Sequence, residues 1–441
     1  MELPKGWASC RLDDANLIIA GQSPESKYYN KNGDGLPFFQ GKADFGQLYP
    51  TNRIYCTVPK KIAKNGDILL SVRAPVGPTN LARETIAIGR GLNAIRPLGG
   101  ISARFVLYYF KQIEPVFSGE GTGTTFSAVT VDDVKSLHFP LPPLAEQHRI
   151  VAKIDALFSK LDKGVEMLQT IRQQLRTYRQ AVLKLAFEGK LTRCGSESKW
   201  IKSNLGSVIC VLTDYHANGS YKVLKENVTL LDREDYAIMI RSTDFEKGDL
   251  SNGLKYIDKH AYEFLKKSQL FGGEILMGKI GNAGRVYYMP FLSRPVSLAM
   301  NMFAIRVKES ILTNKYLYYY LLSPKASQEI KGYVQGDTPT INKTSVRKIG
   351  IEYPESIDRQ VEIVATIESR LSVCDKLEAL VEENFIKAEA LRQSILKKAF
   401  AGLLVPQDPS DEPTEKLLER IRAEKQAATA KLKPARRKKN G

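Results

Sequence analysis

The sequence predicts a mixed α/β protein in which two globular domains are separated by two long helices that form an antiparallel coiled coil within one chain. Three observations lead to this prediction. The chain has 441 residues, which suits two or three domains. Its second half repeats its first half, so a pseudo-twofold relation between the halves is expected. Each half also ends in a long stripe of apolar residues at helical spacing. The predicted segments are 1–143 and 193–356 for the globular domains, 144–192 and 357–402 for the long helices, and 403–441 for a basic C-terminal tail.

The globular domains are predicted from a weaker part of the repeat. GDILLSVRAPVG in the first half resembles GEILMGKIGNAG in the second, and NAIRP resembles FAIRV. Short runs rich in β-formers, bounded by Gly, Asn, Asp and Pro, alternate here with short helical patterns. Each segment is therefore interpreted as a mixed α/β domain of about 150 residues.

The repeat is strongest in the two long helices. Residues 149–191 align with residues 362–404 at a constant offset of 213, and no gap is needed. Gln147 matches Gln360 just before these segments. A repeat of this length in a helical pattern indicates that the two helices make the same contacts in each half of the protein.

Apolar residues in both helices recur at alternating intervals of three and four, which is typical of a coiled-coil seam. Pro142-Pro143 gives a start signal, and Gly189 and Gly402 lie where helices end. Pairing of the two helices is favoured over the alternative that each packs separately on its own domain. The expected seam residues are Ile154, Leu157, Leu161, Leu168, Ile171, Leu175, Tyr178, Val182 and Leu185, and Ile367, Leu371, Cys374, Leu377, Val381, Phe385, Ala388, Leu391, Ile395 and Ala399.

The net charge of +17 comes from 65 Lys and Arg against 48 Asp and Glu. The excess is spread over both globular domains, the first helix and the tail, while the second helix is close to neutral. A polyanion that touches several parts of the protein fits this distribution, although general solubility would explain it as well.

The sequence also disfavours several classes of protein. No apolar run is long enough for a membrane helix, and the N-terminus has no signal pattern. Scattered cysteines and histidines argue for a reducing cytoplasm and against disulfides or a metal site. The Pro142-Pro143 pair lacks the flanking residues of an amino-methyltransferase, and Ile280 stands where a P-loop needs Ser or Thr. We therefore expect no catalytic residue and no metal ligand in this chain.

Four stretches carry a resemblance to a known family. They are FPLPPLAEQHRIVAKIDALFSKLD from Phe139, RQAVLKLAFEGKLT from Arg179, RQSILKKAFAGLLVPQDPSDEP from Arg392, and LPKGW from Leu3. Together with the duplicated layout of nearly the whole chain, they resemble the specificity subunit of type I restriction–modification enzymes.

The resemblance implies a non-catalytic subunit with two target-recognition domains, each reading one half of a bipartite asymmetric site in double-stranded DNA. Its expected partners are two modification subunits, which use S-adenosylmethionine to methylate adenine N6, and up to two ATP-dependent restriction subunits. S-adenosylmethionine, ATP and Mg²⁺ would thus belong to partners, and no cofactor is expected in this chain. The alternatives are a stand-alone two-headed DNA-binding regulator, a coiled-coil scaffold without a DNA role, and an enzyme in its own right such as a nuclease, which the missing motifs disfavour.

Loops that recur in both domains supply the candidate DNA contacts, because Arg, Lys, Asn and Gln read base edges and Ser and Thr hold phosphates. For any single residue, a solvated surface or turn role is equally credible. Arg172, Arg176, Arg179 and Lys184 on the first helix could face DNA, a partner or solvent. The candidates are Gln40, Lys42, Ser71, Arg73, Arg90, Thr124 and Thr125 in the first domain, and Arg241, Ser242, Lys279, Asn282, Arg285, Arg294, Thr338, Asn342 and Lys343 in the second.

Overall fold

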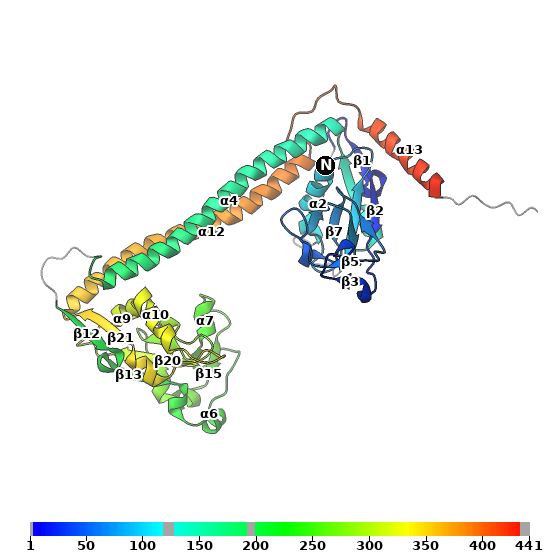
Figure 1. The fold of residues 1–441 in the computed structure, drawn as a ribbon. Coiled ribbons are helices and arrows are strands. Elements are labelled where there is room, and N and C mark those ends of the chain that lie inside the picture. The colour runs from blue at the N-terminus through cyan, green and yellow to red at the C-terminus, as the bar shows by residue number, and fades with distance from the viewer. Residues whose placement is uncertain (1–2, 118–127, 192–198, 433–441) are drawn as a thin grey trace, which may run out of the picture. The chain divides into compact units, whose positions relative to one another are not determined.

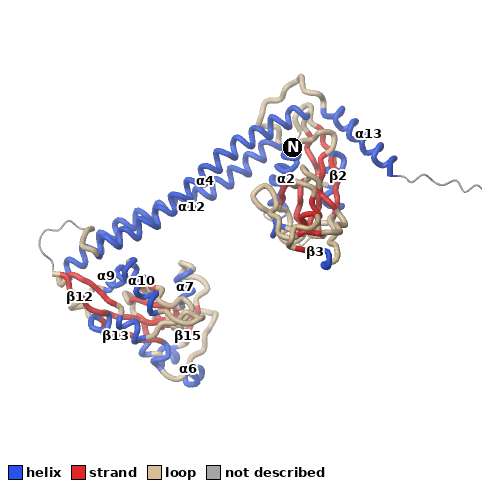
Figure 2. The backbone as a smooth tube through the Cα atoms, viewed as in Figure 1, coloured by secondary structure: helices blue, strands red, loops and turns tan. Residues whose placement is uncertain are grey.

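The computed structural model describes residues 3–117, 128–191 and 199–432. It has the mixed helix and sheet content that the sequence predicts (Figures 1 and 2). The chain divides into two compact units, of which unit 1 is Met1–Leu168 with Glu383–Gly441 and unit 2 is Gln169–Glu382. Each unit contains one globular domain together with part of each long helix.

In the described residues of unit 1, three sheets form the globular domain. Their strand orders are β1-β11, β2-β10-β7-β8 and β3-β5-β4-β9-β6, and β4 and β9 run parallel. The strands are β1 (Ala8–Arg11), β2 (Asn16–Ala20), β3 (Tyr29–Asn30), β4 (Leu36–Phe39), β5 (Tyr55–Cys56), β6 (Ile62–Ala63), β7 (Ile68–Ser71), β8 (Thr79–Leu81), β9 (Ile86–Ile88), β10 (Leu92–Pro97) and β11 (His138–Leu141). The helices are α1 (Leu12–Ala15), α2 (Ala103–Phe117) and α3 (Val131–Ser136), with 3-10 turns at Ser26–Tyr28 and Lys42–Asp44.

The globular domain of unit 2 repeats this topology. Its strand orders are β12-β21, β13-β20-β17-β18 and β15-β14-β19-β16, and β14 and β19 run parallel as β4 and β9 do. The strands are β12 (Trp200–Asn204), β13 (Ile209–Asp214), β14 (Ala237–Ile240), β15 (Lys255–Ile257), β16 (Gln269–Leu270), β17 (Ile275–Gly278), β18 (Val286–Tyr288), β19 (Val296–Leu298), β20 (Met302–Val307) and β21 (Gly350–Pro354). The helices are α5 (Leu205–Val208), α6 (Tyr221–Asn227), α7 (Ser242–Glu246), α8 (Lys259–Phe264), α9 (Asn314–Leu322), α10 (Pro324–Tyr333) and α11 (Lys343–Lys348), with 3-10 turns at Tyr215–Asn218 and Lys266–Ser268.

The two long helices are α4 (Leu144–Phe187) and α12 (Ile357–Phe400), each of 44 residues. They pair antiparallel within each unit. In unit 2, Arg179 forms ion pairs with Asp375 and Glu378. In unit 1, Arg392 pairs with Asp162. This is the equivalent contact with the two helices exchanged, because Arg392 is the repeat counterpart of Arg179 and Asp162 is that of Asp375. The predicted coiled coil and the repeat are both confirmed.

The seam contains most of the predicted residues, but one of its two rows in α4 lies one position further along the chain than predicted. Residues that the pair buries or half-buries recur at 154, 161, 168, 175 and 182 and at 158, 165, 172, 179 and 186 of α4, and at the same positions plus 213 in α12. Some apolar residues expected in the seam flank it instead. The reason is that Arg and Glu occupy seam positions and pair across the helices. The flanking residues, 39–48% exposed, are Ile171, Tyr178, Leu185, Leu377 and Leu391.

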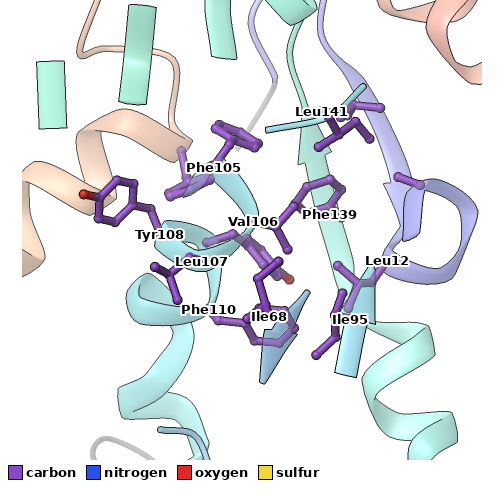
Figure 3. Close-up of a cluster of buried hydrophobic side chains, with 14 of the residues drawn as sticks. Leu12, Ile68, Ile95, Phe105, Val106, Leu107, Tyr108, Phe110, Phe139 and Leu141 are labelled. Atoms are coloured by element: carbon purple, nitrogen blue, oxygen red, sulfur yellow. The ribbon is translucent and has the colours of Figure 1, made fainter. Parts of the chain in front are cut away.

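Each domain core is closed by both long helices. In unit 1, Phe400 at the end of α12 packs on Phe105 with ring centroids 5.0 Å apart. Phe105 belongs to the cluster of buried side chains shown in Figure 3. In unit 2, Phe187 at the end of α4 packs on Tyr316 and Tyr320 at 5.3 and 5.2 Å. Neither helix therefore packs on a single domain, and this is why the repeat extends to the helix ends.

The start of each long helix is also fastened to its domain. Gln147 is buried and accepts a hydrogen bond from the backbone N–H of Ser102 at 3.2 Å. Gln360 accepts one from Thr313 at 3.0 Å and donates to the Ile311 carbonyl at 2.9 Å. Buried amides need such partners, which explains why a polar residue recurs at this position of an apolar segment.

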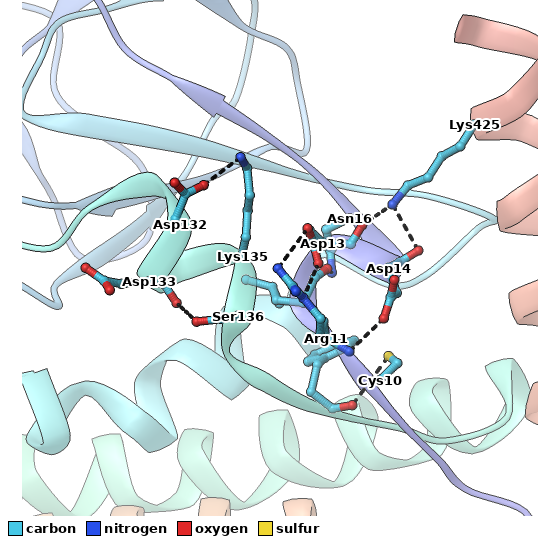
Figure 4. Close-up of polar contacts among 12 residues, drawn as sticks. Cys10, Arg11, Asp13, Asp14, Asn16, Asp132, Asp133, Lys135, Ser136 and Lys425 are labelled. Atoms are coloured by element: carbon cyan, nitrogen blue, oxygen red, sulfur yellow. Dashed lines mark hydrogen bonds and ion pairs between the residues drawn. The ribbon is translucent and has the colours of Figure 1, made fainter.

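The segment after α12 returns to unit 1. Its helix α13 (Thr414–Leu432) buries Leu417 and Ile421 in the core of the domain. Lys425 donates to the backbone carbonyl oxygens of Asp13 and Asp14 (Figure 4). The described part of the tail is thus a structural element of unit 1.

Three further features concern only the part of the chain that the structure describes. No helix there is long and apolar enough to cross a membrane. No group of three or more His, Cys, Asp or Glu is arranged to hold a metal ion. The cysteines in those ranges are free thiols.

Candidate nucleic-acid interface

Candidate residues from three loops of the first domain meet at one cavity. The cavity has a volume of about 490 Å³, and Phe38, Ile54 and Pro75 supply its apolar lining. The polar residues that line it come from the loops after β4, β7 and β9, which are far apart in sequence. They include the candidates Gln40, Lys42, Ser71, Arg73 and Arg90. Thr124 and Thr125 lie outside the described residues.

Backbone contacts bring these loops together. The Gln40 N–H donates to the Asp44 carboxylate at 2.9 Å, which shapes the turn after β4. Gly91 lies directly beneath this turn, because a Cβ at that position would come within 2.1 Å of the Gln40 carbonyl oxygen. Only glycine permits so close an approach. Gln40 and Arg90 consequently line the same cavity.

Ser71 has a different role from the one expected. Its side chain is buried, with the residue 1% exposed, and its hydroxyl lies 3.2 Å from the Arg73 carbonyl and 3.0 Å from the Pro75 carbonyl. The hydroxyl therefore shapes the loop from inside and does not face solvent. Arg73 itself is exposed at the tip of this loop.

The cations of this cavity are available to an anion. Among the described residues, Lys42, Arg73 and Arg90 appear in none of the ion pairs within 4.0 Å. All three are exposed. Three unpaired cations around a partly apolar hollow suit the edges of bases and the adjoining phosphates.

The loop after β14 in the second domain has a backbone hydrogen bond like that of the loop after β4, although its acceptor is three residues along the chain and not four. The Arg241 N–H donates to the Asp244 carboxylate at 2.9 Å, as Gln40 does to Asp44. The expected equivalence of the loops after β4 and β14 is thus visible in their hydrogen bonds. Ser242 follows as the first residue of α7.

Cations in the second domain are held by carboxylates. Arg241 pairs with Asp244 at 2.6 Å, and Asp244 is 1% exposed. Lys279 and Lys343 both pair with Asp214, at 2.6 and 2.7 Å. The side chains are therefore fixed before any ligand arrives, in contrast to the first domain.

Glu246 at the end of α7 gathers three more donors. Its Oε1 accepts hydrogen bonds from Asn282, from Arg285 at 3.5 Å and from the Tyr287 hydroxyl at 3.1 Å. Burial and the Glu246 carboxylate raise the pKa of Tyr287 to about 12, so the phenol stays protonated and donates. Two predicted residues, Asn282 and Arg285, are therefore brought together with α7.

The remaining candidates of the second domain lie in different local surroundings. Thr338 is exposed in the turn that precedes α11, and Asn342 caps α11 by accepting from the Ser345 N–H at 2.8 Å. Arg294 lies between β18 and β19 and pairs with Glu234 at 2.7 Å. Both arginines precede the recurring strands β10 and β20, but they are not counterparts, because Arg90 lies between β9 and β10 whereas β19 stands between Arg294 and β20.

The cations of the first long helix do not form a free patch. Arg172 pairs with Glu382 at 3.3 Å and Arg179 pairs with Glu378 at 2.9 Å, both across the helix pair. Arg176 and Lys184 are exposed. Two of the four positive charges thus hold the helices together.

Sequence reasoning missed the carboxylates of the second domain. A search for base-reading side chains selects Arg, Lys, Asn and Gln, so Asp214 and Glu246 were passed over. None of the repeated sequence motifs includes Asp214, whose counterpart Ala20 is identified by the strand register.

Comparison with known proteins decides the family. The family described as type I restriction modification DNA specificity domain matches residues 4–176 and again residues 197–387. The chain belongs to this family. It is accordingly a specificity subunit, a DNA-recognition protein that is not the catalytic part of a restriction–modification enzyme.

Individual relatives agree over different lengths. The specificity subunit is 29% identical over 470 residues to the type I restriction enzyme EcoBI specificity subunit of Escherichia coli, covering 99% of this chain and 96% of that one. It is 39% identical over 193 residues to the putative MjaX specificity subunit of Methanocaldococcus jannaschii, which covers 43% of this chain and 44% of that one. A solved chain from a study of complex assembly and conformational transition in a type I system shares its fold, with a TM-score of 0.70 at 19% identity, covering 91% and 100% of the two chains.

Proposed function

We propose that this subunit binds a bipartite asymmetric DNA site, one half of which is read by each globular domain. The observation that carries the proposal is the cavity of the first domain, where loops distant in sequence bring Gln40, Lys42, Arg73 and Arg90 together. The topologically equivalent loops of the second domain present different polar residues. Two domains with one fold and different contact residues would read two different half-sites.

The side chains suit direct readout of bases. Arg73 and Arg90 carry the planar donor fork that pairs with guanine O6 and N7, and Gln40 carries the donor and acceptor that match adenine. Lys42 is a point charge suited to a phosphate. In this proposal, phosphate contacts fix the register and the arginine and glutamine contacts select the bases.

We further propose that the subunit works in the cytoplasm, within a complex containing two modification subunits and up to two restriction subunits. These partners would hold S-adenosylmethionine for adenine-N6 methylation, and ATP and Mg²⁺ for cleavage. Exposed apolar side chains on the helix pair support docking of partners, because monomeric soluble proteins rarely expose large contiguous apolar patches outside interaction sites. In unit 2 they include Val373, Leu377 and Leu380.

The proposal is tested by a methylation map of the native genome with and without this gene. The expected result is loss of one bipartite adenine-methylated motif, which also gives both half-sites. An unchanged map would contradict the role in directing methylation. Binding of the purified chain to DNA without a methylase would then favour the stand-alone regulator.

A further inference from the structure

A buried carboxylate joins two lysines in the second domain. Asp214 is the last residue of β13, and its side chain is 7% exposed. One of its oxygens accepts from Lys279 Nζ at 2.6 Å and the other from Lys343 Nζ at 2.7 Å. The lysine side chains are a quarter to a third exposed, so their ammonium groups lie at the edge of solvent.

The three residues come from three different segments that meet at the candidate interface. Lys279 follows β17, and Lys343 begins α11. The Ile341 N–H donates to the Lys279 carbonyl at 3.0 Å, which joins the two lysine-bearing loops through their backbones. The backbones of the two loops are therefore joined without Asp214, whose carboxylate holds only the lysine side chains.

Burial alone would raise the pKa of Asp214. Hydrogen bonds from Lys279 and Lys343 more than offset this effect, so the pKa lies below its ordinary value. The carboxylate is charged at neutral pH. Two ammonium groups facing one carboxylate leave a net charge of +1 at this point.

The first domain has no charge at the equivalent positions. Ala20 of β2 pairs with Asn93 of β10, and Asp214 of β13 pairs in the same way with Phe303 of β20. Asn93 and Phe303 in turn oppose Leu70 and Met277, each one residue before the end of its strand. Ala20 is therefore the counterpart of Asp214.

The lysine positions are matched in the same way. The Val72 N–H donates to the Gly91 carbonyl at 3.0 Å, as Lys279 does to Asn301 at 2.7 Å. Thr130 caps α3 as Asn342 caps α11, so Val131 is the counterpart of Lys343. An Asp-Lys-Lys set in the second domain thus replaces an Ala-Val-Val set in the first.

This difference between the two domains shows whether the three charged residues are needed for folding or serve a function. The first domain shows that the fold forms with uncharged residues at all three positions. Replacing apolar residues by a buried ionic group is seldom a gain in stability, because the charges must be desolvated. The second domain therefore carries these charges for something outside its own core.

We propose that Asp214 is a positioning residue that holds Lys279 and Lys343 as a paired ammonium site for one phosphate of the DNA backbone. The inference rests on the proposed function and assigns the site to the half-site read by the second domain. Without the carboxylate, the two ammonium groups repel each other and the long side chains rotate into solvent. With it, both donors stay at a fixed separation, and the contact sets the register of this domain on the duplex.

The test is a variant that gives the second domain the residues of the first, Asp214→Ala with Lys279→Val and Lys343→Val. Binding of the full chain, with its modification subunit present, is measured on a duplex carrying the mapped site and on a random duplex over a range of salt. The variant is expected to fold, and the slope of log K against log salt is expected to fall by about 0.9 for the lost phosphate. Lys325→Val is the matched control, because it changes the net charge equally at an exposed pair with Glu352.

Asp214→Asn tests the positioning role separately. The lysines remain but are no longer held, so the ratio of specific to random binding is expected to fall about tenfold, while random binding stays equal or rises. An unchanged ratio, or a triple variant with the salt slope of Lys325→Val, would overturn the inference. If the wild-type complex itself shows no preference for the mapped duplex, the proposed function fails instead.

Discussion

Replacing Phe400 or Phe187 by alanine tests whether each domain core is closed by the end of a helix that begins in the other unit. Phe400 lies against Phe105 and Tyr109, with ring centroids 5.0 and 5.8 Å apart. Phe187 contacts Tyr316 and Tyr320 in the same manner. Both phenylalanines are buried, so each substitution removes a complete ring from a packed core.

The expected cost is about 3–5 kcal/mol of unfolding free energy, which combines lost burial with the cavity left behind. Contacts with two aromatic rings, edge-to-face except for the tilted Phe400–Phe105 pair, place both sites in the upper part of that range. For a unit of this size, each kcal/mol lowers the melting temperature by about 2–4 °C, so a fall of about 10 °C is expected.

Hydrogen exchange localises the effect. Phe400→Ala is expected to lower protection in α2 of unit 1, and Phe187→Ala in α9 of unit 2. Leu391→Ala is the control, because this residue of the same helix is 48% exposed, and a change within about 0.5 kcal/mol is expected. Equal loss from Leu391→Ala, or loss of protection in the opposite unit, would refute the assignment of the helix ends to these cores.

Four further outcomes are expected. Arg73→Ala should weaken binding to one half-site by about 1–3 kcal/mol in a titration against duplexes altered in either half, with no change in melting temperature; equal losses on unrelated DNA would make it a phosphate contact. Arg241→Ala should instead lower the melting temperature, because it leaves the buried Asp244 carboxylate without its cation. The pKa of Asp214 is depressed, so its contribution to the free energy of unfolding is present above the ordinary value of 3.8 and is lost as the pH falls through the depressed pKa. The stabilities of wild type and Asp214→Asn, measured by acid unfolding, should therefore converge at low pH. A difference in stability that stays constant with pH would contradict this. Ile421→Asp should detach α13 and lower protection in unit 1 while leaving unit 2 unchanged, as seen by hydrogen exchange.

The loops of the candidate interface could be located from sequence, because the repeat marks the same short motifs twice. Which side chains are free could not. Lys42 and Arg73 are unpaired among the described residues, whereas Lys279 and Arg241 face carboxylates. Ion pairing depends on which strands and loops lie side by side, and Asp214 is 65 residues from Lys279 in sequence.

The seam of the helix pair shows the same division. Spacing of three and four predicts a coiled coil in either of two neighbouring frames. Most apolar residues predicted for the seam lie in it, but positions 179 and 392 hold arginines that meet acidic residues of the opposite helix, and the neighbouring Tyr178 and Leu391 are exposed. The choice is made by partners across the interface, which a single helix does not contain.

By itself, the sequence determined the duplicated organisation, the two long helices, the mixed α/β domains and the family, because these depend on local periodicity and on an offset that can be counted. Tertiary structure alone decided that each helix closes both cores, that α13 packs on the first domain, and that carboxylates hold the cations of the second domain. These features depend on contacts between residues distant in sequence, and burial sets their strength. A linear pattern records which residues are present but not which of them become neighbours on folding.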